Sequence, residues 1–266
     1  MKDKRLDVSS YPAVVRRVPR PDSRKLPAGD LPPGTSLSLF SRNRTADFLA
    51  TVPLLARVTY SELQRLAEVT RERHFARGET ILMRNAPGDA LFIVQRGGVK
   101  VVLTGEDGRE VILGVLGVGE HFGELSLIDE QPRSAHVIAM EDTALLVLRR
   151  DDFRRWVDAN PAIGWALMAE LSRRLRQADG KIGGLVLLDV PGRVARLLLD
   201  TAAEGGVNRI ERRLTHQTIA QMIGASRETV SRAMADFQDN GFISVEKRVI
   251  TIVNPAALME RAAPRP

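Results

Sequence analysis

Six short apolar runs separated by glycine-containing turns constrain the fold of this 266-residue chain more than any other feature. The runs are Thr80–Met83, Ala90–Val94, Val99–Leu103, Val111–Val115, His136–Ala139 and Ala144–Leu148. Turn signals between them include Arg77-Gly78, Pro87-Gly88-Asp89, Gly97-Gly98, Glu106-Asp107-Gly108 and Gly117-Val118-Gly119. Strands this short, spaced roughly 8–12 residues apart, are typical of an antiparallel barrel or jelly roll. We therefore predict an antiparallel β-domain over residues 75–148.

Helical periodicity flanks the predicted strands on both sides. Residues 46–74 place apolar side chains at helical spacing, and Ser61 is the expected N-cap of the second part. Residues 161–188 form a long amphipathic segment, with Asn160 as its expected cap and Pro161 in its first turn.

The long segment carries an apolar seam at spacings of three and four. Its members are Leu171, Leu175, Ala178, Ile182 and Leu185, extended upstream by Ile163 and Leu167. Such a seam favours a parallel pair of identical helices, and a core helix packed within its own domain is the alternative. Gly180, Gly183 and Gly184 each cost a helix interior about 1 kcal/mol relative to alanine. We therefore expect this end of the helix to be frayed or misaligned without a ligand.

A helix-like turn interrupts the strand pattern at Gly123–Ile128. A short helix preceded by glycine presents backbone N–H groups that suit an anion. Arg133 can clamp phosphate oxygens through two parallel hydrogen bonds, Ser134 can add a hydroxyl, and Glu124 can accept from a ribose hydroxyl. The pattern indicates a pocket for a phosphorylated sugar, and a structural ion pair between Glu124 and Arg133 is the alternative.

Two short helices joined by a glycine turn are predicted in the C-terminal part. Thr215 is the expected cap of the first helix, and Ser226 caps the second, which runs to about Asp239. Polar residues cluster on the outer side near the start of the second helix, where a recognition helix meets base edges. They are Arg227, Glu228, Ser231 and Arg232. Arginine pairs well with guanine and glutamate can accept from cytosine, and a hairpin over residues 242–253 is predicted to form a wing.

Composition excludes several classes of function. The absence of cysteine removes disulfides and thiolate chemistry and fits a cytoplasmic protein. The four histidines show no close metal-ligand spacing, so we expect no metal site and place His121 on a solvated loop. No apolar run reaches the roughly 20 residues that a membrane span needs, and we expect no signal peptide.

The net charge of +6 resides in the N-terminal segment. Residues 1–45 hold ten lysines and arginines against four aspartates, whereas the rest of the chain is balanced. Six prolines and few apolar clusters there predict a disordered, basic and proline-rich extension. The extension either adds non-specific phosphate contacts or is simply solvated. DNA binding must therefore be argued from the local placement of charge.

Two motifs resemble a known family. Phe122-Gly123-Glu124-Leu125-Ser126-Leu127, with Pro132-Arg133-Ser134-Ala135, is similar to the phosphate-binding cassette of cyclic-nucleotide-binding domains. Residues 214–232 resemble the helix-turn-helix of Crp/Fnr-family transcription regulators, and residues 189–195 resemble the hinge of that family. The likeness covers about residues 48–253.

The resemblance implies an α+β fold in four parts. A disordered extension (residues 1–45) precedes a cyclic-nucleotide-binding β-roll or jelly roll (residues 46–160). A long central dimerisation helix (residues 161–188) and a C-terminal winged helix-turn-helix (residues 189–266) follow. The implied function is that of a ligand-gated, sequence-specific DNA-binding transcription regulator and not an enzyme.

The resemblance also implies the site residues. Glu124 would hold the ribose 2′-hydroxyl, and Arg133 and Ser134 would hold the cyclic phosphate. The expected ligand-binding residues are Gly123, Glu124, Leu125, Arg133, Ser134, Arg174, Ala178 and Asp179. The expected DNA-binding residues are Thr215, Gln217, Ser226, Arg227, Glu228, Thr229, Ser231 and Arg232. No catalytic residue, metal or cofactor is expected.

Cyclic AMP is the expected effector because the cassette is intact. In cyclic-AMP receptors the central helix offers hydroxyl residues to the adenine, and Ala178 and Asp179 occupy those places here. An ionised Asp179 can only accept, so it would meet the adenine amino group or favour the N–H donors of guanine. Cyclic GMP is the second candidate, and a regulator without nucleotide control or with another effector is the third.

The implied partners are double-stranded DNA with a palindrome of TGTGA-like half-sites, a second copy of the chain, and RNA polymerase, with no membrane. Arg227 and Arg232 would read guanines, and Glu228 would lie opposite a cytosine. Two rival hypotheses remain open. One is an enzyme built on a nucleotide-binding domain, and the other is an architectural DNA binder that needs no ligand.

Overall fold

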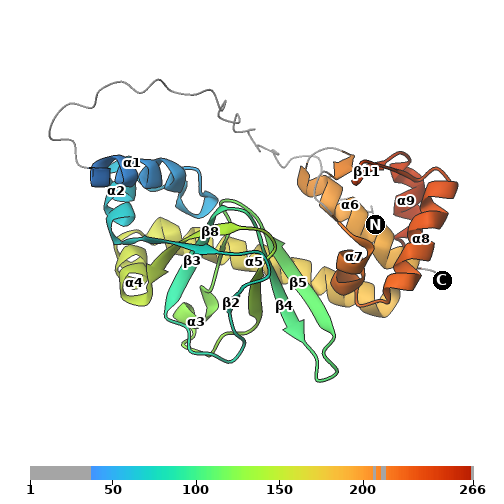
Figure 1. The fold of residues 1–266 in the computed structure, drawn as a ribbon, viewed down its shortest axis with the longest axis horizontal. Helices are drawn as coiled ribbons and strands as arrows, with labels where there is room; N and C mark the ends of the chain where they lie inside the picture. Colours follow the sequence, from blue (N-terminus) through green and yellow to red (C-terminus); the bar gives the residue numbers. More distant parts are fainter. Residues whose placement is uncertain (1–36, 206–207, 211–213, 265–266) are drawn as a thin grey trace, which may run out of the picture. The chain divides into compact units, whose positions relative to one another are not determined.

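The computed structural model describes residues 37–205, 208–210 and 214–264 (Figure 1). Three helical elements precede the first strand: α1 (Leu37–Leu49), the 3₁₀ turn η1 (Pro53–Leu55) and α2 (Tyr60–Val69). Helix α1 begins inside the segment that we predicted to be disordered, so that prediction extended too far toward the C-terminus. Residues 1–36 of the predicted extension lie outside the described residues.

Eight strands form two antiparallel four-stranded sheets. They are β1 (Arg71–Phe75), β2 (Thr80–Leu82), β3 (Ala90–Arg96), β4 (Val99–Thr104), β5 (Glu110–Leu116), β6 (His121–Phe122), β7 (His136–Ala139) and β8 (Thr143–Arg149). The strand orders are β1-β8-β3-β6 and β2-β7-β4-β5. All six predicted strands are present, which confirms the β-roll. Strands β1 and β6 were not predicted, and β1 lies where the sequence indicated helix.

The central strands of the first sheet, β3 and β8, are buried on both faces. Along β3, Phe92 and Val94 point into a core between the sheets, whereas Leu91 and Ile93 pack against the helical elements. This two-sided burial explains why β3 reads as a continuous apolar run and not as an alternating one. The second core joins α1, η1, α2 and the helices that follow β8 to the back of this sheet.

Local capping fixes where α2 begins. Thr59, and not the predicted Ser61, is its N-cap. The Thr59 backbone N–H donates to Glu62 Oε2 at 2.9 Å, and the Thr59 hydroxyl donates to the same oxygen at 2.6 Å. This capping box satisfies an N-terminal donor that would otherwise be unpaired.

Two helices lead away from the β-roll: α4 (Arg150–Ala159) and α5 (Pro161–Leu187). Asn160 occupies the N-cap position of α5, but its side chain makes no cap bond and instead donates to Trp156 O at 3.1 Å. Helix α5 is continuous for 27 residues, so its glycine-containing end is not frayed in this structure.

The predicted seam of α5 is divided between two faces. Ile163 and Leu167 are buried against the β-roll, whereas Leu175 and Ile182 are 64% and 60% exposed. Five of the exposed apolar side chains of α5 follow a heptad spacing, and we call these five the α5 stripe; Leu185 and Leu187 are also exposed but lie outside it. Its members are Trp165, Met168, Leu175, Ile182 and Val186. The prediction of one continuous seam was wrong, because it joined residues of the buried face to residues of the exposed face. A helix that packs one face against its own domain needs a second partner to cover a second apolar face.

The C-terminal part is a winged helix-turn-helix around one core. Its elements are α6 (Val190–Gly205), β9 (Arg209–Ile210), α7 (His216–Ile223), α8 (Arg227–Asp239), β10 (Ile243–Glu246), β11 (Val249–Ile252) and α9 (Pro255–Arg261). The predicted caps are confirmed: Thr218 N–H donates to Thr215 Oγ1 and Thr229 N–H donates to Ser226 Oγ. Gly224 lies in the left-handed region (φ 63°) and turns the chain between α7 and α8.

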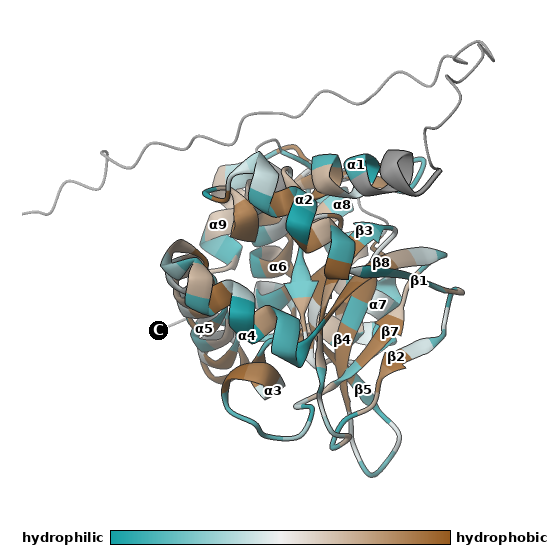
Figure 2. Ribbon diagram, turned by 90° about the vertical axis from the view of Figure 1, so that its left-hand side faces the viewer, coloured by the Kyte–Doolittle hydropathy of each residue, from teal (hydrophilic) through white to brown (hydrophobic). Residues whose placement is uncertain are grey.

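Hydropathy is distributed as these packing faces require. In Figure 2 the single turn α3 (Leu125–Ile128) is apolar, whereas α4 shows polar residues along its outer side. None of the helices in the described ranges has the length and apolarity that a bilayer crossing requires.

Candidate functional site

One cavity lies between the β-roll and α5 and extends to α6 and α7 of the C-terminal part. Seven of the eight expected ligand-binding residues line it. They are Gly123, Glu124, Leu125, Arg133, Ser134, Arg174 and Ala178. Asp179 is the exception, because it is exposed and does not line the cavity. Asp179 shares the heptad spacing of the α5 stripe, between Leu175 and Ile182.

Arg133 is buried, with 4% of its surface exposed. Its Nη1 donates to Gly123 O at 2.7 Å and its Nη2 donates to Ala90 O at 2.9 Å. Its Nε has no hydrogen-bond partner among the described residues. Burial lowers the pKa of this guanidinium, while Asp89 and Glu124 oppose the shift. The cassette therefore holds a largely desolvated cation at the wall of the cavity, which favours an anionic partner.

Gly123 is required by the conformation of the cassette. Its φ is +87°, and a Cβ there would lie 2.8 Å from Arg133 Nη1 and 2.9 Å from Ala90 O. A side chain would therefore displace the guanidinium. The glycine is needed both for its backbone and for the space next to Arg133.

Glu124 is buried as deeply as Arg133, with 3% exposed. Its Oε1 accepts from Arg174 Nη1 at 3.0 Å, so the ion pair expected as an alternative with Arg133 is formed with Arg174 instead. Its Oε2 has no hydrogen-bond partner in the described part of the chain. Burial raises the pKa of the Glu124 carboxyl, and Arg174 partly offsets this rise. An unpaired buried carboxylate oxygen on a cavity wall is an acceptor for a ligand donor.

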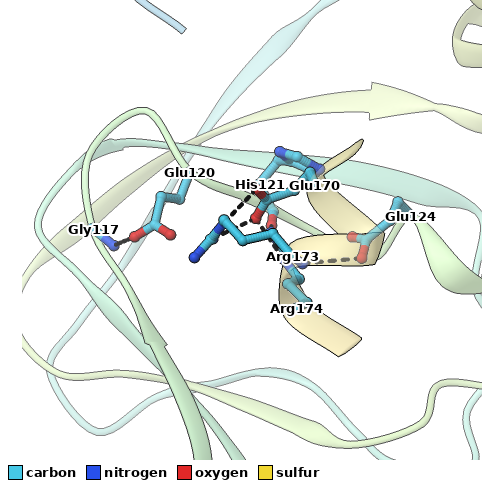
Figure 3. A network of polar contacts seen from close by, with 7 residues as sticks. All are labelled: Gly117, Glu120, His121, Glu124, Glu170, Arg173 and Arg174. Carbon is cyan, nitrogen blue, oxygen red and sulfur yellow. Dashed lines mark hydrogen bonds and ion pairs between the residues drawn. The ribbon is translucent and has the colours of Figure 1, made fainter. Parts of the chain in front are cut away.

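Arg174 connects α5 to the cassette (Figure 3). Besides Glu124, it donates through Nη2 to His121 O at 2.8 Å and through Nε to Glu170 Oε1 at 2.8 Å. Glu170 also accepts from Arg173. Burial raises the pKa of Glu170, but the hydrogen bonds from Arg173 and Arg174 outweigh it and lower the pKa to about 2. The two arginines therefore face a permanently charged carboxylate.

His121 does not lie on a solvated loop as predicted. It belongs to β6, is 4% exposed, and its Nε2 has no partner in the described ranges. Burial lowers the pKa of His121 to about 4, and the neighbouring cation Arg174 adds to this shift. The imidazole is therefore neutral at physiological pH. The glycines around it indicated a turn, but its burial depends on α5, which is remote in sequence.

The further residues that line the cavity and were not predicted include Ser126, Gln177 and Lys181. Gln177 and Lys181 are three residues after Arg174 and Ala178, on the same helical face. Helical spacing from Arg174 was thus sufficient to find them. The Lys181 ammonium donates to Leu113 O of β5, which ties this part of α5 to the β-roll.

The expected DNA-binding residues gather at the N-terminal ends of α7 and α8. Thr215 and Ser226 are the two N-caps. Exposed side chains are provided by Gln217, Arg227, Glu228 and Arg232, and half-buried ones by Thr229 and Ser231. The helix-start N–H of Glu228 and the Ser226 hydroxyl lower the pKa of Glu228, so this carboxylate is ionised. The surface therefore offers two cations, an anion and several hydroxyls on one helix start.

Two side-chain contacts in this region were not predicted. His216 Nδ1 and Ser231 Oγ lie 2.8 Å apart and link α7 to α8. Arg193 of α6 donates to Ile223 O at 2.8 Å and holds the end of α7. The helix pair is therefore fixed at both ends by side-chain hydrogen bonds.

Comparisons with known proteins match both parts of the chain. Residues 72–160 match the cyclic nucleotide-binding domain, and residues 192–261 match the Crp-like helix-turn-helix domain. A CRP-like cAMP-activated global transcriptional regulator of Mycobacterium tuberculosis is 37% identical over 221 residues, 81% of this chain and 99% of that protein. The cyclic AMP receptor protein of Thermus thermophilus is 35% identical over 211 residues, 79% of this chain and 96% of that protein.

Solved structures agree with this fold. A variant of CooA from Carboxydothermus hydrogenoformans superposes with a TM-score of 0.68 at 26% identity, covering 80% of this chain and 95% of the other. A β-roll with a lined cavity, joined to a winged helix-turn-helix, defines a ligand-responsive DNA-binding transcription regulator. This chain belongs to the Crp/Fnr family of such regulators, which are not enzymes.

Proposed function

We propose that this regulator binds a cyclic nucleotide, with cyclic AMP as the first choice, in the cavity between the β-roll and α5. The observation that carries the proposal is the unpaired Oε2 of buried Glu124 on the same wall as Arg133. A ribose hydroxyl would donate to Glu124, and Arg133, Ser134 and the backbone at Gly123 would hold the cyclic phosphate. Both relatives named above carry cyclic AMP in their names, which supports this choice.

Cyclic GMP is the second candidate. The cavity wall at Ala178 offers no side-chain hydrogen bond to a base, so this position does not select adenine. Asp179 lies outside the wall of its own chain, and we infer that it reaches the base bound by a partner chain.

Titration calorimetry with cyclic AMP and cyclic GMP tests the proposal. We expect saturable cyclic AMP binding that Arg133→Gln weakens by about 10–100-fold, because a charge-assisted contact contributes roughly 1.5–3 kcal/mol. Arg109→Gln, on an exposed hairpin, is the control and should bind as the wild type does. A wild-type protein that takes up neither nucleotide would overturn the proposal and leave the regulator without nucleotide control.

We further infer that the chain forms a parallel homodimer through the α5 stripe. Five large apolar side chains between 50% and 77% exposed lie at heptad spacing there. Exposed apolar surface of this length marks an association site, and the pattern fits a two-stranded coiled coil. A dimer would place two α8 helices about one DNA turn apart, to read a palindrome.

The proposed operator is a palindrome of TGTGA-like half-sites, with Arg227 and Arg232 on guanines and Glu228 opposite a cytosine. RNA polymerase is the proposed protein partner at such operators. Fluorescence anisotropy with a labelled palindrome should show tight binding that each half-site substitution weakens by roughly 1–3 kcal/mol. Binding that ignores the half-site bases would contradict the operator. Binding that ignores cyclic AMP would favour an architectural DNA binder.

A further inference from the structure

We propose that Arg150, the first residue of α4, is a positioning residue for the nucleotide-binding cassette. Its guanidinium holds together the two segments between which Arg133 lies. The inference rests on the proposed nucleotide binding and extends it to a residue outside the cavity wall. Neither the cassette motif nor the helix-turn-helix motif includes Arg150.

The contacts of Arg150 converge on carbonyl groups of two separate segments. Its Nη2 donates to Gly88 O, in the turn before β3, and to Ser126 O at 3.0 Å, in the helix turn α3. Its backbone N–H donates to Asp89 O at 2.7 Å. One residue thus joins the start of α4, the turn at Gly88 and the cassette helix.

Both bridged segments shape the place where Arg133 lies. A Cβ at Gly88 would be 2.5 Å from Ser126 Cβ and 2.8 Å from Arg133 Cζ, so the turn packs directly against the cassette. Ala90, two residues after Gly88, provides the carbonyl that accepts from Arg133 Nη2. If the turn at Gly88 moved away from α3, Arg133 would lose both a packing surface and an acceptor.

The main chain of Arg133 is bound to the same turn. Arg133 N–H donates to Ala86 O at 2.9 Å, and Asn85 N–H donates to Arg133 O at 2.9 Å. Arg133 is therefore held from three directions, by residues 85–86, by Ala90 and by Gly123. Arg150 fixes the two pieces of chain from which these groups come.

The charge of Arg150 is unfavourable for its neighbour. Burial is the main cause that lowers the pKa of Arg133, and the nearby guanidinium of Arg150 adds to this shift. A second cation here is tolerated because its donors satisfy buried carbonyls of the site. Two like charges thus lie close together at the arginine that is proposed to bind the anion. Such a locally unfavourable arrangement is expected at a functional position.

Arg154, one turn further along α4, provides a matched control. It pairs with Glu130 at the end of the same cassette segment, but both side chains are more than half exposed. An exposed ion pair contributes little. Arg154→Met therefore removes an arginine that lies on the same helix and contacts the same cassette segment. It leaves the hydrogen bonds to the carbonyls of Gly88 and Ser126 in place.

The experiment compares Arg150→Met, Arg150→Lys and Arg154→Met by titration calorimetry with cyclic AMP and with cyclic GMP. We expect Arg150→Met to weaken both nucleotides by the same factor, about tenfold or about 1.4 kcal/mol, because it acts on the phosphate cassette and not on the base. Arg150→Lys should recover part of the loss, since an ammonium keeps the charge but lacks the planar fork. Arg154→Met should stay within about twofold.

A second measurement separates positioning from general destabilisation. Amide hydrogen exchange of the ligand-free protein should rise at residues 123–128 in Arg150→Met and remain unchanged at the core of α6–α9. Should Arg150→Met fail to fold, the affinity and exchange of Arg150→Lys decide the question. Wild-type binding with no loss in either Arg150 variant would overturn this inference, whereas the absence of wild-type binding would overturn the proposed function.

Discussion

Two buried ionisable residues that Arg174 contacts, Glu124 and His121, have pKa values displaced from their ordinary ones. The carboxyl pKa of Glu124 is raised and the imidazole pKa of His121 is lowered, in both cases chiefly by burial. Arg174 compensates the carboxylate but adds repulsion to a protonated imidazole. Deep burial of ionisable groups beside a cavity is typical of a functional site, because structural positions are filled more stably by apolar residues.

His121 gives a pH-dependent prediction. Its folded pKa of about 4 lies below the ordinary value of 6.5, so the unfolded chain takes up the proton first as the pH falls. Stability is therefore lost as the pH falls below about 6.5, by about 2 kcal/mol at pH 5 from this residue alone. The free energy of unfolding of His121→Leu, measured with guanidinium, should fall between pH 7 and pH 5 by about 2 kcal/mol less than that of the wild type. Equal losses in both proteins would contradict the assignment, and the exposed His74→Gln serves as the control.

At the scale of elements, α5 combines apolar packing faces with glycines that weaken the helix. The helix is continuous through Gly180 and Gly183, where a Cβ would meet no other atom within 4 Å. The glycines are therefore not required for space within one chain. They reduce the stability of this part of the helix, next to the cavity wall at Ala178 and Lys181.

Replacing both glycines by alanine should stabilise the helix by about 1 kcal/mol each. If the glycine-containing end must be ordered for DNA binding, Gly180→Ala/Gly183→Ala will raise operator affinity measured without nucleotide. Fluorescence anisotropy with and without cyclic AMP measures this. Gly164→Ala, near the other end of α5, where a Cβ would meet Val157 Cγ1 at 3.8 Å, controls for a general gain in helix stability. An unchanged dependence on ligand would contradict the ordering mechanism.

The elements also show how far the sequence alone could go. Strands between glycine turns and the helices capped by Thr215 and Ser226 were predicted correctly, because their signals lie within a few residues. Strand β6 was missed, since two residues carry no period, and β1 was missed because Arg71–His74 are exposed and polar.

For the candidate site, the cassette motif was sufficient to place Gly123, Glu124, Leu125, Arg133 and Ser134, all of which line the cavity. It did not indicate His121, Glu170 or Arg150, whose roles depend on contacts between α4 or α5 and the β-roll. The division of the α5 seam into two faces could not be predicted for the same reason. Periodicity shows that a residue is on a face, but not which partner covers it.

At the scale of the whole molecule, a single chain leaves an apolar face of α5 uncovered. The α5 stripe exposes Trp165 and Val186 to 70% and 77%, although both are large and apolar. A second chain would cover the stripe and bring Asp179 of each chain toward the partner. Association and effector binding would then share one helix.

Charge in the stripe tests the dimer. Leu175→Glu and Ile182→Glu should convert a dimer into monomers in analytical ultracentrifugation, because like charges would face each other across the pair. The affinity for the palindrome should fall by more than tenfold, since a monomer contacts only one half-site. Val118→Glu, equally exposed on a β-roll loop, should leave both unchanged. A wild-type protein that sediments as a monomer would contradict the proposed dimer.

Arg174 is bound to two carboxylates and a carbonyl of its own chain. Its bond to Glu124 Oε1 orients the carboxylate and leaves Oε2 for an effector, so the effector meets an acceptor that is already positioned. For a sensor, the firmness of that positioning sets the concentration at which the response begins. Substitution at Glu170 can shift this threshold while every group that recognises the effector stays the same.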